Sequence, residues 1–249
     1  MNRFLLGAVF FATAAAQQPP SAPSAAARLA LAANPVLVEL FTSEGCSSCP
    51  PADALIEKLD RLQPFPEARV IVLSEHVDYW DHQGWRDPFS SASFTARQEQ
   101  YARQFGSSGP YTPQMVVDGA AEFVGSDAGA AASAIRSAAR REKVAIRLVP
   151  GAETVRVEVD PLPGGKKGKS LVYVALAQDS GTSNVSAGEN RGRTLHHVAI
   201  VRQLRQIGSV SGLAGFTGEI PASPGDRIVA FVQDPGSGRI RGAGLLKRQ

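Results

Sequence analysis

Two cysteines, Cys46 and Cys49, are the residues of this 249-residue chain whose type and spacing most clearly indicate chemistry. They are the chain's only cysteines. An apolar run, residues 36–41, leads into them, and a helical pattern of leucine and isoleucine, residues 55–62, follows. A CxxC pair between a strand and a helix is typical of a redox dithiol. A structural bridge is the alternative, but closing so short a loop removes little entropy from the unfolded chain.

The position of each cysteine predicts its role. Cys46 falls at the start of the predicted helix, where the helix dipole and free N–H groups favour a negatively charged sulfur. Cys49 falls one turn later, within reach of a mixed disulfide formed on Cys46. We therefore expect Cys46 to attack and Cys49 to resolve, with a protein thiol or disulfide as partner and no cofactor.

A metal site is the alternative use of the same thiols. Zinc would require four ligands, and the sequence holds no second CxxC pair. Cu(I) prefers soft ligands, so Cys46, Cys49 and His76 could bind copper for delivery. A third possibility is a binding module in which the CxxC pair is inactive.

Aromatic and ionisable residues are concentrated directly after the second predicted strand, residues 69–75. The stretch 76–89 holds both tryptophans, Trp80 and Trp85, together with His76. Loops that follow buried strands often carry binding residues. We expect these three side chains to contact substrate, within an insertion that spans residues 76–110.

The order of the predicted elements resembles the thioredoxin fold. A strand, the CxxC pair, a helix and a second strand are followed by a strand that begins at Thr112–Pro113, a hairpin and a last helix ending near residue 141. In that fold a cis-proline at the start of a strand lies beside the CxxC pair. The resemblance therefore assigns this place to Pro113, as part of the catalytic set, and a substrate contact to Thr112.

Five segments also resemble the DUF1223 family of exported bacterial proteins. They are VELFTSEGCSSCPPAD (38–53), HVDYWD (76–81), GWRDPF (84–89), YTPQM (111–115) and GENRGRTL (188–195). The resemblance implies a thioredoxin-like domain and a location outside the cytoplasm, but it supplies no substrate.

Three further ionisable residues are open to interpretation. Glu39 lies within an apolar strand, either as a buried proton-shuttling acid with a raised pKa or as a strand-edge carboxylate in solvent. His196 and His197 are adjacent, and neighbouring residues of a strand face opposite ways. We therefore interpret both histidines as structural.

The second half of the chain has the pattern of an all-β domain. Alternating apolar runs are separated by turns rich in Gly and Pro, at 144–148, 155–159, 171–177, 198–204, 228–232 and 242–246. This pattern is typical of a sandwich. The predicted architecture is an α/β thioredoxin-like domain, residues 35–141, followed by a β-sandwich-like domain, residues 142–249.

The N-terminus has the features of a secretory signal. Arg3 precedes a short apolar run, and residues 14–16 are alanines that suit signal cleavage. We expect a signal peptide at 1–16, a flexible segment at 17–34, and a periplasmic or secreted mature protein. The apolar run is too short to span a bilayer. The net charge of +3 is spread along the chain, which does not favour nucleic-acid binding.

Overall fold

The structure is a computed structural model that describes residues 33–165, 168–221 and 226–248. The expected signal peptide and nearly all of the expected flexible segment, residues 1–32, lie outside the described residues. Among the helices within these described ranges, none is both long and apolar enough to cross a membrane.

The first half alternates strands and helices close to the predicted positions. Its apolar runs form strands because β-branched and aliphatic residues fit a pleated, buried surface. Pro50 and Pro51 occupy the first turn of the first described helix, where no N–H is needed. The elements are β1 (Asn34–Thr42), α2 (Pro50–Leu62), β2 (Ala68–His76), the 3-10 turn η1 (Asp81–Gln83), α3 (Ala92–Phe105), β3 (Gln114–Val117), β4 (Ala121–Val124) and α4 (Ala128–Ala139).

The second half is built from strands. All six predicted runs are strands, and one further strand, β9, interrupts its apolar pattern with Gly218 and Glu219. The elements are β5 (Ile146–Pro150), β6 (Thr154–Val159), the 3-10 turn η2 (Pro163–Gly165), β7 (Lys169–Asn184), β8 (Thr194–Ser211), β9 (Phe216–Pro221), β10 (Asp226–Gln233) and β11 (Ile240–Lys247). At 16 and 18 residues, β7 and β8 are far longer than predicted.

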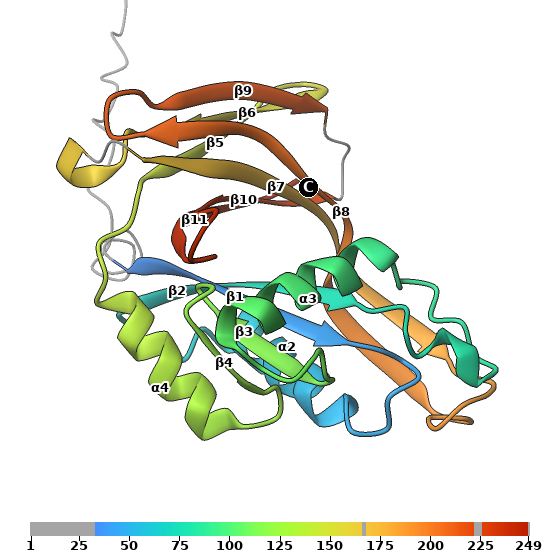
Figure 1. The fold of residues 1–249 in the computed structure, drawn as a ribbon. Coiled ribbons are helices and arrows are strands. Elements are labelled where there is room, and N and C mark those ends of the chain that lie inside the picture. Colours follow the sequence, from blue (N-terminus) through green and yellow to red (C-terminus); the bar gives the residue numbers. More distant parts are fainter. Residues whose placement is uncertain (1–32, 166–167, 222–225, 249) are drawn as a thin grey trace, which may run out of the picture.

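One mixed sheet of eight strands joins the two halves, in the order β11-β10-β7-β8-β2-β1-β3-β4. The junction is a parallel pairing of β8 with β2, between Ile200 and Ser74. The remaining strands form a three-stranded sheet, β5-β6-β9. Figure 1 shows β7 and β8 running from the strand-rich upper layers down alongside the helices of the first half.

This topology corrects the predicted fold class. A thioredoxin-like α/β domain followed by a separate β-sandwich-like domain requires two independent sheets, and that prediction is wrong. The strands before and after residue 141 belong to the same sheet, because β7 and β8 extend past their own layer and β8 pairs with β2. Local periodicity predicted most of the strands correctly, but it carries no information on this long-range pairing.

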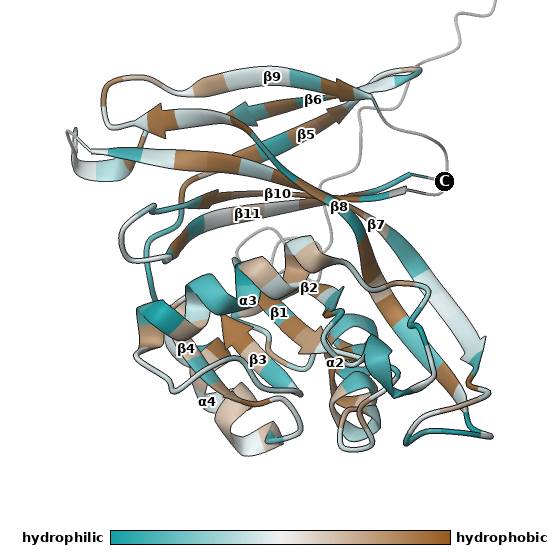
Figure 2. Ribbon diagram, turned by 45° about the vertical axis from the view of Figure 1, so that its right-hand side comes forward, coloured by the Kyte–Doolittle hydropathy of each residue, from teal (hydrophilic) through white to brown (hydrophobic). Residues whose placement is uncertain are grey.

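The core has a layer on each face of the sheet. Side chains of β1, β2 and β3 on one face pack against α2 and α4. On the other face, Leu37, Ile71 and Leu73 pack against β7, β10 and β11. A third cluster lies between β7 and β10 and the three-stranded sheet. Figure 2 shows hydrophobic residues concentrated on β1 and on the middle of the β7–β8 pair.

A buried arginine also ties the two halves together. Arg227, on β10, is about 1% exposed and donates both terminal nitrogens to Asp60 of α2, at 3.0 and 2.6 Å. Its Nε donates to Asp179 of β7 at 2.9 Å. The position of α2 therefore depends on a residue 167 positions later in the sequence.

We predict that Arg227→Ala lowers the free energy of unfolding by about 3 kcal/mol, because it removes the buried partner of Asp60 and leaves that carboxylate only a 3.8 Å contact with the half-exposed Lys247. Urea unfolding provides the measurement. Arg103→Ala is the matched control, since Arg103 forms an exposed helical pair with Glu99 and its loss should cost under about 1 kcal/mol. Equal losses in the two variants would contradict the assigned role of Arg227.

Candidate functional site

The two cysteines form a disulfide at the N-terminus of α2. Cys49 is the N-cap residue, and its carbonyl accepts hydrogen bonds from the backbone of Ala52 and Asp53. Both cysteines are fully buried, whereas Ser47 and Ser48 between them are exposed. The Ser48 hydroxyl lies 3.4 Å from the Cys46 sulfur. The predicted placement is therefore shifted: Cys49, expected one turn into the helix, is its N-cap, and Cys46, expected at the helix start, lies three residues before it. The sulfur atoms of both are covered.

The loop that joins β7 to β8, residues 185–193, provides part of that cover. Asn190 is fully buried and donates from Nδ2 to the carbonyls of Glu44 and Cys46, each at 2.9 Å. The Glu189 carboxylate accepts from the Ser47 backbone N–H at 2.9 Å. This β7–β8 loop therefore binds the backbone of the disulfide turn directly.

A buried charged cluster flanks the disulfide. His197, from β8, lies between two carboxylates, with Nε2 3.3 Å from Glu44 Oε1 and Nδ1 3.8 Å from Asp53 Oδ1. The Thr42 hydroxyl donates to Asp53 at 2.9 Å, and the Trp85 indole donates to Glu44 at 2.8 Å. All of these side chains except that of Trp85 are buried.

Electrostatics make His197 a cation at neutral pH. Burial opposes the charge, but Asp53 and Glu44 outweigh it and raise the pKa of His197 to about 10. An imidazolium paired with carboxylates is the arrangement by which opposite charges stabilise one another inside a protein.

His76 belongs to the same cluster. It is fully buried, and its Nδ1 lies 2.7 Å from Asp87 Oδ2. Its ring centre is 4.6 Å from that of His197. Burial tends to raise the pKa of Asp87, but His76 and the N–H groups of Glu44 and Phe89 together lower it. The loop after β2 is thereby joined to the turn before Cys46.

Trp80 connects the predicted proline to this turn. The Thr112–Pro113 peptide bond is cis. The Trp80 indole donates to the Thr112 hydroxyl at 2.8 Å. A Cβ placed on Gly45 would come 2.9 Å from Trp80 Cβ, so only glycine fits there without a shift. Trp80 is half-buried and thus spans the space between the Thr112–Pro113 segment and the residue before Cys46.

Glu39 lies in a different cluster. It is fully buried, so the expectation of a solvent-exposed strand-edge carboxylate is wrong. Arg97 Nε donates to it at 2.7 Å and the Tyr101 hydroxyl at 2.6 Å. Glu75 faces the same Arg97 at 3.5 Å, and burial raises its pKa well above the usual range. This cluster holds α3 against β1 and β2, and its hydrogen bonds do not include the disulfide turn.

Sequence reasoning missed the contribution of the second half to the site. The alternation rule correctly separated the two histidines: His196 is exposed and contacts Thr182, whereas His197 points inward. The interpretation of His197 as structural overlooked the two carboxylates that lie on either side of its ring. The available signal was the GENRGRTL segment, which holds Glu189 and Asn190 and ends just before these histidines.

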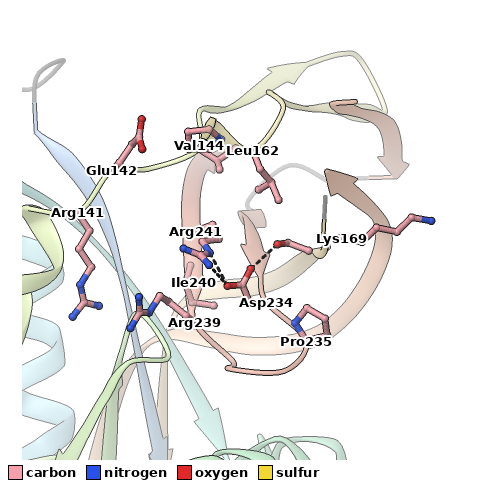
Figure 3. Close-up of a pocket in the computed structure, with 13 residues that line it drawn as sticks. Arg141, Glu142, Val144, Leu162, Lys169, Asp234, Pro235, Arg239, Ile240 and Arg241 are labelled. Carbon is pink, nitrogen blue, oxygen red and sulfur yellow. Dashed lines mark hydrogen bonds and ion pairs between the residues drawn. The ribbon is translucent and has the colours of Figure 1, made fainter. Parts of the chain in front are cut away.

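The structure leaves the alternative uses of the site untested. Within residues 33–165, 168–221 and 226–248, there is no group of three or more His, Cys, Asp or Glu side chains placed to hold a metal ion. The Cu(I) set of Cys46, Cys49 and His76 thus stays a prediction. A cavity of about 470 Å³ lies elsewhere, lined by residues 141–142, 144, 162–163, 168–170, 234–235 and 239–241. Figure 3 shows Arg241 directed at Asp234 in it, and Lys169 pointing away.

Comparison with known proteins identifies the family of this chain. The sequence matches the family described as "Protein of unknown function (DUF1223)" over residues 37–233, which include the disulfide, the Thr112–Pro113 segment and the β7–β8 loop. The chain belongs to the DUF1223 family. The resemblance noted in the sequence is thereby confirmed, and no curated protein gives a significant match.

Two solved structures resemble this DUF1223 protein over most of its length. A crystal structure of an Agrobacterium tumefaciens protein is 29% identical, with a TM-score of 0.73, covering 87% of this chain and 96% of that one. HBP35 of Porphyromonas gingivalis is 16% identical, with a TM-score of 0.55, covering 87% of this chain and 76% of that one. The first likeness extends across both halves, in agreement with the single eight-stranded sheet.

We predict that the charge on His197 makes stability depend on pH. Its folded pKa is raised, so its contribution is complete below the unfolded value of about 6.5 and is lost as pH rises toward about 10. One such group gives a slope of about 1.4 kcal/mol per pH unit. Denaturant unfolding from pH 6.5 to 10 should therefore show a shallower decline in His197→Gln than in the wild type. His196→Gln should keep the wild-type slope, and identical slopes in all three proteins would exclude the charged His197.

Proposed function

We propose that this DUF1223 protein performs thiol–disulfide exchange with protein partners through Cys46 and Cys49. The supporting observation is that the chain's two cysteines are bonded to each other at a helix N-terminus, beside a buried cluster of an imidazolium and carboxylates. A bridge across two residues is a weak constraint on folding. Helix N-termini favour thiolates, which are the reactive form in exchange.

The exchange proceeds in two balanced steps. A partner thiolate attacks the Cys46 sulfur, a new S–S bond forms, and Cys49 leaves as a thiolate that carries the electron pair. A second partner thiolate then attacks the partner's sulfur in the mixed disulfide and releases Cys46. The partner is oxidised to a disulfide and the protein is reduced to a dithiol; the reverse sequence reduces a partner disulfide.

Access to the sulfurs requires movement of their cover. Cys46 and Cys49 are fully buried, so a partner first meets the exposed Ser47 and Ser48. The β7–β8 loop is held to this turn by only a few hydrogen bonds. Half-buried Trp80 and Thr112 are suited to contact the partner chain once the loop opens.

The proposed location is outside the cytoplasm. The support for it is the signal-like pattern of residues 1–16. Disulfides persist in oxidising compartments such as the bacterial periplasm, where a CxxC pair encounters protein thiols as substrates.

We predict different outcomes for the two cysteine variants. Cys46→Ser should abolish reduction of a protein disulfide such as that of insulin, because the attacking sulfur is lost. Cys49→Ser should accumulate a mixed disulfide on Cys46, because the resolving sulfur is lost. Turnover assays and non-reducing gels distinguish these outcomes. Unchanged turnover in Cys46→Ser would eliminate the proposed function.

We also predict that Asn190→Ala speeds the opening of the disulfide. Two hydrogen bonds of about 1 kcal/mol each from Asn190 help to hold the β7–β8 loop closed, so their loss should raise the rate of reduction by dithiothreitol by about thirtyfold. Asn184→Ala is the matched control, because Asn184 is exposed and bonds only to Thr194 across the same hairpin. Equal rates in both variants and the wild type would show that the loop does not limit access.

A further inference from the structure

The buried imidazolium lacks good hydrogen bonds. Neither ring nitrogen of His197, nor Glu44 Oε1, has a partner at hydrogen-bond geometry. The contacts at 3.3 and 3.8 Å are therefore mainly electrostatic. The attraction of Glu44 and Asp53 nevertheless outweighs the cost of burying the charge, which is why the pKa of His197 is raised. The same cluster lies beside the disulfide, so its charges also bear on the chemistry of the two cysteines.

Each carboxylate that faces His197 lies close to a cysteine along the chain. Glu44 precedes Cys46 by two residues. Asp53 follows Cys49 by four residues on α2, and residues at this helical spacing have Cβ atoms about 5–6 Å apart. When the disulfide opens, the charge on Cys49 therefore develops one helical turn from a carboxylate, which would oppose it by like-charge repulsion.

Of the groups that face Glu44 and Asp53, one carries a positive charge. Trp85 and Thr42 are neutral donors to the carboxylates. The nearby His76 is held by its own carboxylate, Asp87. Among the described residues, His197 is the only basic side chain within ion-pair distance of Glu44 or Asp53.

On the basis of the proposed exchange function, we propose that His197 is a positioning residue of the redox site. Its imidazolium neutralises Asp53 and thereby stabilises the Cys49 thiolate that leaves when a partner thiolate attacks Cys46. The electron pair of the broken S–S bond stays on Cys49, and the new S–S bond joins Cys46 to the partner. The site is thus incomplete without a residue from the second half of the chain.

Two readouts test this role without any protein partner. In a Cys46→Ser background, Cys49 is the single thiol, and its pKa follows from thiolate ultraviolet absorbance against pH. In the protein with both cysteines, the rate of disulfide opening by dithiothreitol reports on Cys49 as leaving group. We expect His197→Gln to raise the Cys49 pKa by about one unit and to slow opening by about threefold.

Opposite signs separate this role from a structural one. Asp53→Asn should lower the Cys49 pKa and speed opening, and the double variant should return both values toward the wild type. His196→Gln, on the exposed face of the same strand, should change neither value. If His197→Gln and Asp53→Asn shift the pKa in the same direction, or not at all, the proposal is overturned.

The test of His197 does not depend on whether the protein exchanges disulfides with a protein partner. If wild type fails to exchange disulfides with proteins but the opposite pKa shifts are found, the proposed function fails and the positioning role of His197 stands. If His197→Gln does not fold, a Cys49 pKa that rises or stays constant in Asp53→Asn still contradicts the proposal.

Discussion

The parallel pairing of β8 with β2 is the contact on which the rest of the structure depends. It joins strands that originate on either side of residue 141 into one sheet, and it brings the N-terminal end of β8 beside the start of α2. Because β7 and β8 are continuous over 16 and 18 residues, the same hairpin forms part of the upper core at one end and covers the disulfide at the other. The buried Arg227–Asp60 pair also holds the two halves together, because it binds the C-terminal end of α2 to β10.

Charge and burial at the dithiol follow from this arrangement. A helix N-terminus alone would favour negative sulfur, but Glu44 and Asp53 act in the opposite direction. His197 compensates for them from outside the local sequence. The cover formed by Asn190 and Glu189 excludes solvent, which strengthens each of these electrostatic effects. In the proposed exchange, the reactivity of Cys46 and Cys49 thus depends on groups more than 140 positions away.

Much of the fold and part of the site could be predicted from the sequence. The strands and helices around Cys46 follow from apolar runs and from Pro50 and Pro51 at the helix start, which are local signals. The joined sheet could not be predicted, because the single pairing of Ser74 with Ile200 leaves no trace in periodicity. His197 was missed for a related reason. Alternation along the strand shows that its side chain points away from that of His196, but it does not show which side chains surround it. β9 was missed because Gly218 and Glu219 interrupt its apolar pattern.

The placement of Asn190 and His197 has a consequence for the order in which the site is assembled during synthesis. The two cysteines emerge from the ribosome early, whereas the residues that bury them are made more than 140 positions later. A nascent chain that ends before β8 has both thiols but lacks the hairpin that shields them and the cation that balances their surroundings. Oxidation of Cys46 and Cys49 can therefore precede closure of the cover, while both sulfur atoms are still accessible.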